Sequence, residues 1–509
     1  MRSEGLRALE ARFGLSLFAR GFLLSESDPR FIPAGWREVA LHKTRLWTHP
    51  WTPVEWRRTD AGELVLGGHA VDHDEPALSN GAIADRLLAS LTEPPQRLHE
   101  LTDNLNGRWF LLHRRTGASG WRLAADATGM RSVFHHADGG TAGSHARLVA
   151  ENVAATWQER DRSRFGYPGR RTPYSEVLLL PPNQELDLST GQLHRTYPRA
   201  SLAPRTVEVA ATEALQLMRS CFAGLLERFA SPVVSLTAGI DSRLTLAASR
   251  EVSDRLRFFT YYRGDDVQTD LADRAVAEHL AARLGLDHRT LHLDSADEQF
   301  LQLCEAHSYY RHLPRAARRY VQEFDPSSDA HVRSNLSEIG RCFYRSTKNV
   351  TAEPATGEDL ASIYLRFSRQ EVTPAARQRI VEDFTDLHRV TRFAAAARLR
   401  SGRDLLYWEH RMGAWHALAV LESDPAFESF SLFNSRRLLD VLLSVPEEER
   451  VRASVFHRII AQGWPEVARV PINPRKDEAA LLRDGHAPTG GPAGRMRRRW
   501  HRWRRRERD

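Results

Sequence analysis

The chain has 509 residues, of which 41% are hydrophobic and 27% are charged. Both fractions are typical of globular proteins, so they exclude wholesale disorder, and the length predicts two to four domains with buried cores. No stretch approaches ~18 uninterrupted apolar residues, and no basic segment leads into an apolar core at the N-terminus, so we expect neither a membrane span nor a secretory signal. The three cysteines, Cys221, Cys304 and Cys342, give neither a disulfide framework nor paired metal-ligand spacing, which favours the cytoplasm.

The formal net charge of +7 is concentrated in one segment. Residues 486–509 contain nine arginines against Glu507 and Asp509, an excess that accounts for the whole net charge. The rest of the chain is therefore close to neutral, which argues against a nucleic-acid partner. We expect residues 486–509 to be an Arg-rich disordered tail, which could contact anionic surfaces such as lipid or RNA.

Short apolar runs separated by Gly, Asp and Pro predict a β-rich first part of the chain. The predicted strands are residues 13–24, 37–49, 62–68, 108–115 and 120–128. Between and after them, segments 81–91 and 97–105 have helical spacing, and segment 132–154 reads as a hairpin leading into a helix. Residues 196–206 contain prolines and lack periodicity, so we place a linker there and expect a first domain over residues 1–200.

From residue 207 the pattern changes to alternating helices and strands. A long amphipathic helix over residues 207–230 is followed by three apolar strands with two helices between them. The strands are expected at 231–236, 255–262 and 288–293, and the helices at 244–252 and 270–286. This series is the signature of a parallel, doubly wound sheet. Residues 296–480 are mostly helical in pattern, and we expect the second domain to span 207–485.

Residues 233–243 read VVSLTAGIDSR and predict an anion-binding turn. A buried strand ends in small residues and a helix starts at once, so the first N–H groups of the helix would face the turn. Thr237 and Ser242 add hydroxyl donors, and Asp241 supplies a carboxylate suited to Mg²⁺. Neither GxxxxGK[ST] nor GxGxxG is present. An ordinary strand-to-helix turn is the alternative interpretation.

The LTAGIDS part of this turn resembles the LSGGxDS pyrophosphate loop of the asparagine synthetase family of N-type ATP pyrophosphatases. The resemblance implies that ATP and its pyrophosphate contact Leu236, Thr237, Ala238, Gly239, Ile240, Asp241 and Ser242. Thr237 stands where the family has Ser, and Ala238 stands where it has its first Gly. The first change keeps a hydroxyl, and the second introduces the smallest side chain that could replace Gly.

Residues 333–344, RSNLSEIGRCFY, resemble the SGxGxDExxGGY segment that follows the loop in this family. Alignment on the terminal aromatic residue places Glu338 at the metal-binding Asp and Gly340 near the glycine pair. The resemblance therefore implies that Asp241 and Glu338 hold Mg²⁺ and act as catalytic residues. Asn335 stands where the family has a catalytic Glu or Tyr, so the usual base is missing.

Three glutamates are candidate substitutes for that base: Glu409, Glu422 and Glu428. They lie on segments that the pattern predicts to be helical, so each could equally be a solvated helix carboxylate. The segment that contains Glu428 continues into SFSLFNSRRLLDVLLSVP, which resembles the family's xVPFLDxxLVExxxxLP run with Asn434 in place of the Asp. Asp270 and Asp273 open a predicted helix, and we expect them to cap it.

In the segment PINPRK, Lys476 corresponds to the lysine with which the family ends its synthetase domain. The resemblance places this lysine near the α-phosphate and the developing tetrahedral intermediate. Lys476 is one of three lysines in a chain with 69 arginines, which indicates that a compact, rotatable ammonium is needed there. A solvated surface lysine is the alternative.

The first part of the chain carries a second resemblance. Residues 105–110, LNGRWF, together with 121–126 and 131–134, resemble the LxGxFAF and LxxDxxGxxPLYY runs of the class II glutaminase domain. Position 2 is Arg where that domain has its nucleophilic Cys, the first cysteine is Cys221, and the NGEIYN-type glutamine pocket is missing. We therefore expect the fold to be retained and glutamine hydrolysis to be lost.

The combined resemblance is to an asparagine synthetase-like protein. It implies an Ntn-type αββα sandwich followed by a doubly wound, adenine-nucleotide α-hydrolase-like domain with a helical C-terminal part. It further implies that a small-molecule or peptide carboxylate is adenylated by ATP with Mg²⁺, releasing pyrophosphate, and is then joined to an amine or ammonia. The β-lactam synthetases and lasso-peptide cyclases are similar in this respect. A catalytically inactive homologue that acts as a scaffold, and an RNA-modifying ATP pyrophosphatase, are the alternatives.

Overall fold

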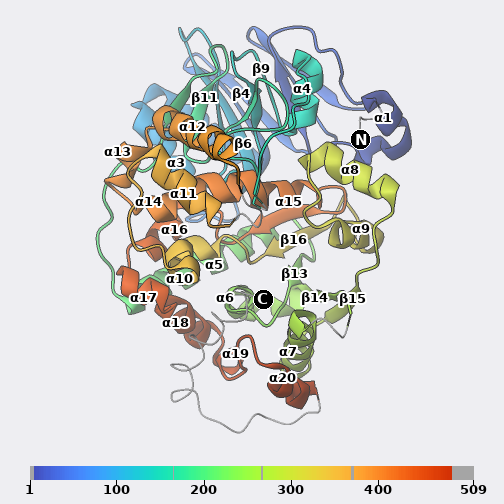
Figure 1. Ribbon diagram of the computed structural model, residues 1–509, viewed down its shortest axis with the longest axis vertical. Coiled ribbons are helices and arrows are strands. Elements are labelled where there is room, and N and C mark those ends of the chain that lie inside the picture. The colour runs from blue at the N-terminus through green and yellow to red at the C-terminus, as the bar shows by residue number, and fades with distance from the viewer. Residues whose placement is uncertain (1–4, 164, 265–267, 368–371, 484–509) are drawn as a thin grey trace.

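The computed structural model describes residues 5–163, 165–264, 268–367 and 372–483, and it combines two antiparallel sheets with one parallel sheet (Figure 1). The predicted order, a β-rich first part followed by a parallel sheet, is confirmed. The assignment of the two parts to the Ntn-type and α-hydrolase-like classes stays a prediction, as does the domain division. The tail at 486–509 lies outside the described residues. Within those residues, none of the helices has the length and apolarity needed to cross a membrane.

The first part of the chain forms two antiparallel sheets of six strands each. The first sheet has the order β10 (Val177–Leu179), β8 (Phe134–His136), β9 (Thr141–Gly143), β1 (Phe22–Ser25), β3 (Thr44–Thr48) and β2 (Arg37–Leu41). The second has the order β12 (Leu193–Arg195), β11 (Gln184–Asp187), β7 (Arg122–Ala125), β6 (Leu105–Arg115), β5 (Gly62–Asp72) and β4 (Val54–Thr59). Both sheets lie in the upper part of Figure 1.

Helices cover the outer faces of these two sheets. Helix α4 (Ala146–Val153) contacts the first sheet, and α2 (Asn80–Ala89) and α3 (Pro95–Asp103) pack on the second. Side chains of β5 alternate between the two sides, as strand geometry requires, so Leu64 faces α2 while Val65 faces the other sheet. Between the sheets, the rings of Phe22 and Phe110 stack at 4.1 Å. The space between the sheets is therefore an apolar core.

The strand predicted over residues 13–24 is wrong for most of its length. The chain there forms α1 (Leu6–Phe13) and a 3₁₀ turn, η1 (Gly14–Ser16), and it becomes extended only at β1. Gly14, Phe18 and Arg20 all have positive φ, which interrupts an extended backbone whatever the apolar content. The helices at 81–91 and 97–105, and the hairpin and helix within 132–154, are found near their predicted positions.

The second part of the chain contains a five-stranded parallel sheet. Its order is β15 (His288–His292), β14 (Arg257–Tyr262), β13 (Val233–Ser235), β16 (Ala330–Arg333) and β17 (Glu428–Ser431). One face packs against α5 (Val207–Leu226), α6 (Ile240–Ala248), α7 (Gln268–Leu284) and α18 (Ser454–Gly463), and the other against α9 (Pro314–Glu323). Strands β16 and β17 lie in a region predicted as mostly helical, where four-residue strands leave little periodicity to detect.

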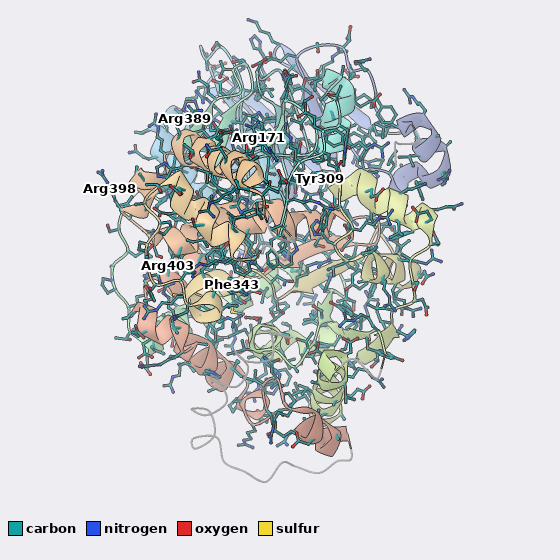
Figure 2. All side chains as sticks on the ribbon, viewed as in Figure 1. Arg171, Tyr309, Phe343, Arg389, Arg398 and Arg403 are labelled. Atoms are coloured by element: carbon teal, nitrogen blue, oxygen red, sulfur yellow. The ribbon has the colours of Figure 1, made fainter. Side chains whose placement is uncertain are left out.

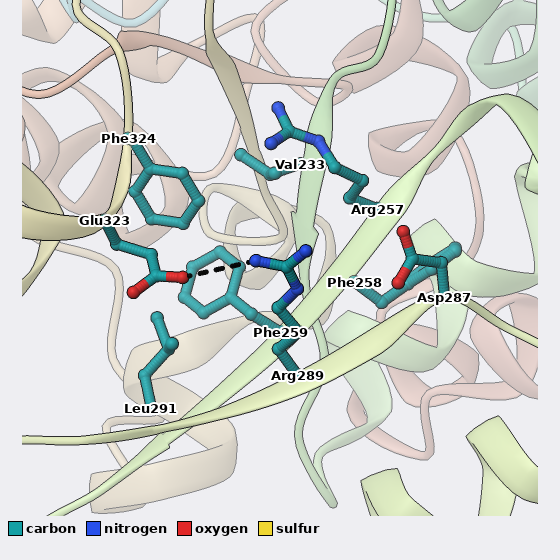
Figure 3. A pocket seen from close by; sticks show the side chains of 9 residues that line it. All are labelled: Val233, Arg257, Phe258, Phe259, Asp287, Arg289, Leu291, Glu323 and Phe324. Carbon is teal, nitrogen blue, oxygen red and sulfur yellow. Dashed lines mark ion pairs between the residues drawn. The ribbon is translucent and has the colours of Figure 1, made fainter.

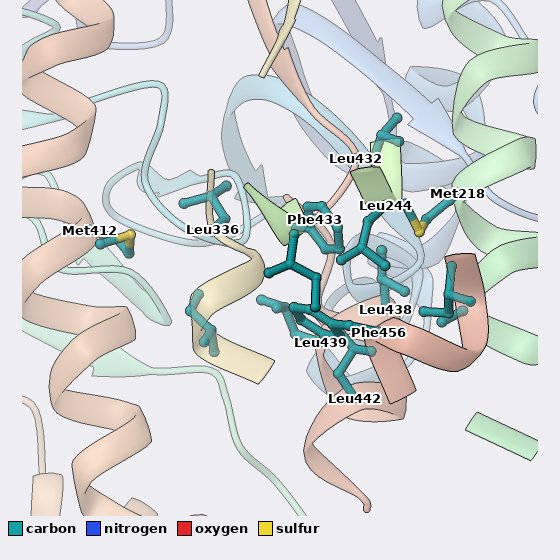
Figure 4. Packing of buried hydrophobic residues seen from close by; sticks show 14 of the residues in the cluster. Met218, Leu244, Leu336, Met412, Leu432, Phe433, Leu438, Leu439, Leu442 and Phe456 are labelled. Atoms are coloured by element: carbon teal, nitrogen blue, oxygen red, sulfur yellow. The ribbon is translucent and has the colours of Figure 1, made fainter. Parts of the chain in front are cut away.

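The remaining helices are spread along the chain. They are η2 (Ser90–Thr92), η3 (Arg250–Arg255), α8 (Glu298–Ser308), η4 (Ser337–Arg341), α10 (Phe343–Lys348), α11 (Gly357–Leu365), α12 (Pro374–Val390), α13 (Phe393–Ala397), α14 (Gly402–Leu406), the π-helix η5 (Tyr407–His416), α15 (Ala417–Leu421), α16 (Arg436–Leu443), α17 (Glu447–Val451), α19 (Pro465–Ala468) and α20 (Lys476–Arg483). Figure 4 shows how the buried side chains of Leu244 on α6, Leu439 on α16 and Phe456 on α18 pack together.

A buried ionic network joins the two parts of the chain. Arg108 on β6 makes two hydrogen bonds to Asp424, the longer of 2.7 Å, and Arg131 lies 3.2 Å from both carboxylate oxygens of Glu428. Arg20 lies 3.4 Å from Glu428. None of these five side chains is more than 4% exposed. Burial alone would raise the pKa of Glu428, but the three guanidinium groups together lower it to about 2.

Uncharged hydrogen bonds reinforce this interface. Asn434 accepts from Thr128 N and Oγ1 at 3.0 and 2.7 Å and donates to Gly107 O at 2.6 Å. Asn106 Nδ2 donates to Leu432 O at 2.8 Å. The residues that carried the glutaminase resemblance therefore meet those of the SFSLFN segment, and they bind the two parts together.

Replacing Glu428 by Gln is expected to lower the free energy of unfolding by about 3 kcal/mol or more, because buried guanidinium groups lose their shared counter-ion. The lowered pKa means that ionised Glu428 stabilises the protein above pH 4.5 and that this contribution is lost as the pH falls toward 2. Urea unfolding at pH 7 and pH 3 measures both effects, and the difference between the two proteins should shrink at pH 3.

The exposed Glu100, which lies 3.5 Å from Arg97, provides the control. Glu100→Gln is expected to change the free energy of unfolding by less than about 0.5 kcal/mol. Equal effects of the two substitutions would contradict a structural role for the network.

Candidate active site

The predicted anion-binding turn lies at the carboxyl end of β13, the middle strand of the parallel sheet. Leu236 N donates to Phe259 O at 2.9 Å, and Thr260 Oγ1 donates to Leu236 O at 2.6 Å, so the turn is held against β14. Helix α6 begins at Ile240 with Gly239 as its N-cap, and no side chain caps its first turn. The first N–H groups of α6 can therefore receive an anion.

The two hydroxyls of the turn bond to the turn itself. Ser242 Oγ accepts from Thr237 N at 3.2 Å and lies 3.0 Å from Thr237 Oγ1, which accepts from Gly239 N at 3.2 Å. These bonds fix the backbone shape of the turn. The predicted contacts of Thr237 and Ser242 with a pyrophosphate stay predictions.

Asp273 is a part of this site that the sequence analysis assigned a different role. Its Oδ1 accepts a hydrogen bond from Ala238 N at 2.7 Å, and burial raises its pKa to about 6. Since α7 begins at Gln268, Asp273 lies beyond the first helical turn and is not a cap. Asp270 instead binds the backbone N–H and guanidinium of Arg263. No local signal in the sequence marks this contact, because Ala238 and Asp273 are 35 residues apart.

The two predicted metal ligands come together from neighbouring strands. Asp241 follows β13, and Glu338 lies on η4, which follows β16. Asp241 Oδ1 accepts from Ser337 Oγ at 2.6 Å, and Asp241 Oδ2 lies 2.9 Å from Arg341. Glu338 Oε2 is buried and has no hydrogen-bond partner within the described residues. The structure thus brings a partnered carboxylate beside a carboxylate that lacks a ligand.

The protonation of Glu338 reflects this arrangement. Burial and the nearby Asp241 raise its pKa to about 7, against the opposing effect of Arg341. A divalent cation would relieve the repulsion between the two carboxylates and bond to the unpartnered oxygen, so these residues fit Mg²⁺. Across the described ranges, no group of three or more His, Cys, Asp and Glu side chains is suited to a metal. The pair would therefore share an ion with phosphate oxygens or water.

The backbone before Glu338 is strained. Leu336 has φ of 81°, a left-handed conformation that is costly for a residue with a branched side chain. Asn335 O accepts from Ser431 Oγ at 2.7 Å, which fixes the turn against β17. At Gly340, an added Cβ would lie 3.0 Å from Leu442. The turn is thereby held in the conformation that places Ser337 and Glu338 beside Asp241.

The third predicted element also reaches the turn. Asn473 N donates to Ala238 O at 2.9 Å, and Arg243 donates to the carbonyls of Val470 and Pro471 at 3.1 and 2.9 Å. This segment leads directly into α20, whose first residue is Lys476. The Lys476 side chain lies outside the described residues, so its role stays a prediction.

The three candidate bases are buried and hydrogen-bonded to other parts of the chain, so none is a solvated helix carboxylate. Arg195 binds both oxygens of Glu409 at 2.7 and 2.9 Å. Glu422 accepts from Ser308 Oγ and from the backbone N–H groups of residues 312 and 313 at 2.7 to 2.8 Å. Glu428 begins β17 within the ionic network. These contacts join elements of the fold, and whether any of the three glutamates acts as a base stays a prediction.

A separate shallow hollow lies at the other end of the strands of this sheet (Figure 3). It is lined by residues at the amino-terminal ends of β13, β14 and β15, among them Val233 and Arg257, and by the end of α9. Arg289 and Glu323 face each other across it at 3.5 Å. Ligands of open α/β sheets bind at the carboxyl ends of the strands, so this hollow is a weaker candidate than the turn.

No family model and no curated protein matches the sequence. Among solved structures, the chain resembles a glutamine phosphoribosylpyrophosphate amidotransferase from B. subtilis in complex with ADP and GMP, at 10% identity and a TM-score of 0.24, over 60% of this chain and 90% of that one. It also resembles a glutamine-dependent NAD⁺ synthetase from Acinetobacter baumannii in complex with ADP, at 14% identity and a TM-score of 0.15. That match covers 48% of this chain and 56% of the synthetase. Both TM-scores are low, and neither likeness identifies the function of this chain.

Glu338→Gln is expected to stabilise the ligand-free protein at pH 8 by about 1–2 kcal/mol. A carboxyl whose pKa is raised from 4.5 to about 7 loses stability as the pH rises between these values, and a neutral amide avoids that loss. Urea unfolding at pH 5 and pH 8 measures the effect, which should be smaller at pH 5.

The same substitution is expected to abolish stabilisation by Mg²⁺. Adding Mg²⁺ should raise the Tm of the wild type and leave that of Glu338→Gln unchanged. Glu323→Gln, at the other end of the strands, is the matched control and should respond to Mg²⁺ like the wild type. An unchanged Mg²⁺ response in Glu338→Gln would remove Glu338 from the metal site.

Proposed function

We propose that this chain is an ATP-dependent, AMP-forming ligase that activates a carboxylate and joins it to an amine. The observation that carries the proposal is the convergence of the uncapped start of α6 with Asp241 and Glu338 at the carboxyl ends of β13 and β16. An N–H cradle beside two carboxylates suits a polyphosphate with its divalent cation.

In the proposed reaction, a carboxylate oxygen of the substrate attacks the α-phosphorus of ATP. The bond from that phosphorus to the bridging oxygen breaks, and pyrophosphate leaves with the electron pair. The first N–H groups of α6 would bind the leaving pyrophosphate, and the bonds among Thr237, Gly239 and Ser242 would hold the turn in shape. Asp241 and Glu338 would hold Mg²⁺, which would neutralise charge on the polyphosphate.

An amine then attacks the acyl carbon of the adenylate, AMP leaves with the electron pair of the acyl–oxygen bond, and the nitrogen releases a proton to water as the amide forms. The Lys476 ammonium is proposed to stabilise the negative charge that develops at the phosphorus and at the acyl carbon. Glutamine would not supply the amine, because no cysteine lies in the first 200 residues. The amine is therefore free ammonia or an amino group of the substrate.

Asp241→Asn is expected to lower ATP–pyrophosphate exchange by at least about 100-fold, because it removes a charge from the proposed metal pair. The assay uses purified protein, Mg²⁺ and pools of amino acids and other carboxylates. Asp294→Asn, an exposed carboxylate outside the site, is the control and should keep full exchange. Circular dichroism of Asp241→Asn should match the wild type.

Three outcomes separate the proposal from its alternatives. Exchange that needs one pool and is lost in Asp241→Asn supports the ligase. Full exchange in Asp241→Asn contradicts its role. No exchange, together with no binding of Mg-ATP in a calorimetric titration, indicates an inactive scaffold.

A further inference from the structure

Arg411 lies in an uncommon structural setting. It is the middle of the ten-residue π-helix η5, a conformation that is rare and is found most often at functional sites. The side chain is 5% exposed. The spacing along η5 places Tyr407, Arg411 and Trp415 four residues apart, and both aromatic rings lie within 5.4 Å of the guanidinium carbon.

Three further rings complete a cage around the guanidinium. The centroids of Phe165, Phe343 and Phe367 lie 3.4, 4.4 and 4.9 Å from its central carbon. Phe165 belongs to the first part of the chain, whereas the other rings belong to the second. Phe343 begins α10, in the helical region beneath the antiparallel sheets (Figure 2). The cage therefore lies where the two parts of the chain meet.

The rings leave part of the hydrogen-bonding edge of Arg411 unsatisfied, although the Tyr344 hydroxyl lies beside the guanidinium. Cation–π contacts are made by the faces of the guanidinium, whereas its N–H bonds lie in its plane. Both Nε and Nη1 are buried without a hydrogen-bond partner among the described residues. No carboxylate of the described chain lies within 4.0 Å of Arg411, in contrast to the buried arginines of the ionic network. A buried cation without a counter-ion is costly, and an anionic ligand would remove that cost.

The cage is close to the candidate active site. Phe343, whose ring contacts Arg411, lies five positions after Glu338 on η4. The positive charge of Arg411 is also near enough to oppose the rise in the pKa of Glu338. An anion bound to Arg411 would thus lie near the two carboxylates that are proposed to hold the metal.

We propose that Arg411 and its five rings bind the carboxylate of the substrate, and that this substrate is a monocarboxylate with an aromatic body. The charge of the guanidinium selects one anionic group, and the aromatic walls would leave a second charge uncompensated. This inference rests on the proposed function, because it names the class of acid that is activated.

The test is ligand binding by the full chain in the absence of nucleotide. Phenylacetate at 10 mM is expected to raise the Tm of the wild type by at least about 1 °C, and the neutral isostere phenylacetamide should cause no shift. Arg411→Met keeps the apolar stem and removes the charge, so it should abolish the shift. Arg411→Lys keeps a cation but loses the planar donors, and calorimetry should show phenylacetate binding at least about 10-fold weaker than in the wild type.

The matched control is Arg170→Met, which removes a buried arginine that is already paired with Asp386 at 2.9 Å. This variant should keep the response to phenylacetate. Equal shifts with phenylacetate and phenylacetamide, no shift of the wild type, or a full shift in Arg411→Met would each overturn the inference. If Arg411→Met does not fold, the comparison of the two ligands on the wild type and on Arg411→Lys decides.

The two proposals fail in different ways. A shift with phenylacetate but no pyrophosphate exchange would leave the carboxylate site and remove the ligase. Pyrophosphate exchange could instead depend on acids without an aromatic group, while phenylacetate causes no Tm shift. That result would support the ligase activity and contradict the proposed role of Arg411.

Discussion

The position of the parallel sheet depends on the buried network in which Arg20, Arg108 and Arg131 surround Asp424 and Glu428. Three guanidinium groups and two carboxylates are removed from water together, and the desolvation of each is offset only while its partners stay in place. Such a network tolerates few alternative geometries. It fixes Glu428, and with it the start of β17, against the antiparallel sheets.

From β17 this constraint passes to the candidate site through a short series of contacts. Strand β17 pairs with β16 from Ala330 to Arg333, and Ser431 at its end holds the carbonyl of Asn335. The next residues form the strained turn that places Glu338 beside Asp241. Through these contacts, the first part of the chain fixes the geometry of the candidate site.

The sequence predicted the elements whose signal is local and missed those that depend on distant contacts. The turn at 236–242 was found because an apolar strand, small residues and a helix follow one another. Asp273 and Arg411 were not, because their partners are far along the chain and their own neighbours resemble any amphipathic helix. The alternative to a catalytic role, that of a solvated helix carboxylate, was wrong for Glu409, Glu422 and Glu428. Helical spacing in the sequence does not show that an arginine or a backbone N–H group bonds to a carboxylate.

The buried charged side chains of this protein fall into two groups, those whose polar atoms all have partners and those with unpartnered polar atoms. The carboxylates of Asp424, Glu409 and Glu428 are each paired with a guanidinium group, and these ion pairs link different helices and strands. Arg411 is buried and Glu338 is partly buried, yet each has buried polar atoms without a partner among the described residues. Folding alone would favour replacing both by apolar residues, because an unpaired buried polar group is destabilising. Their charges are of opposite sign and near enough to interact, so the two proposed ligands, a cation at Glu338 and an anion at Arg411, would be of opposite charge as well.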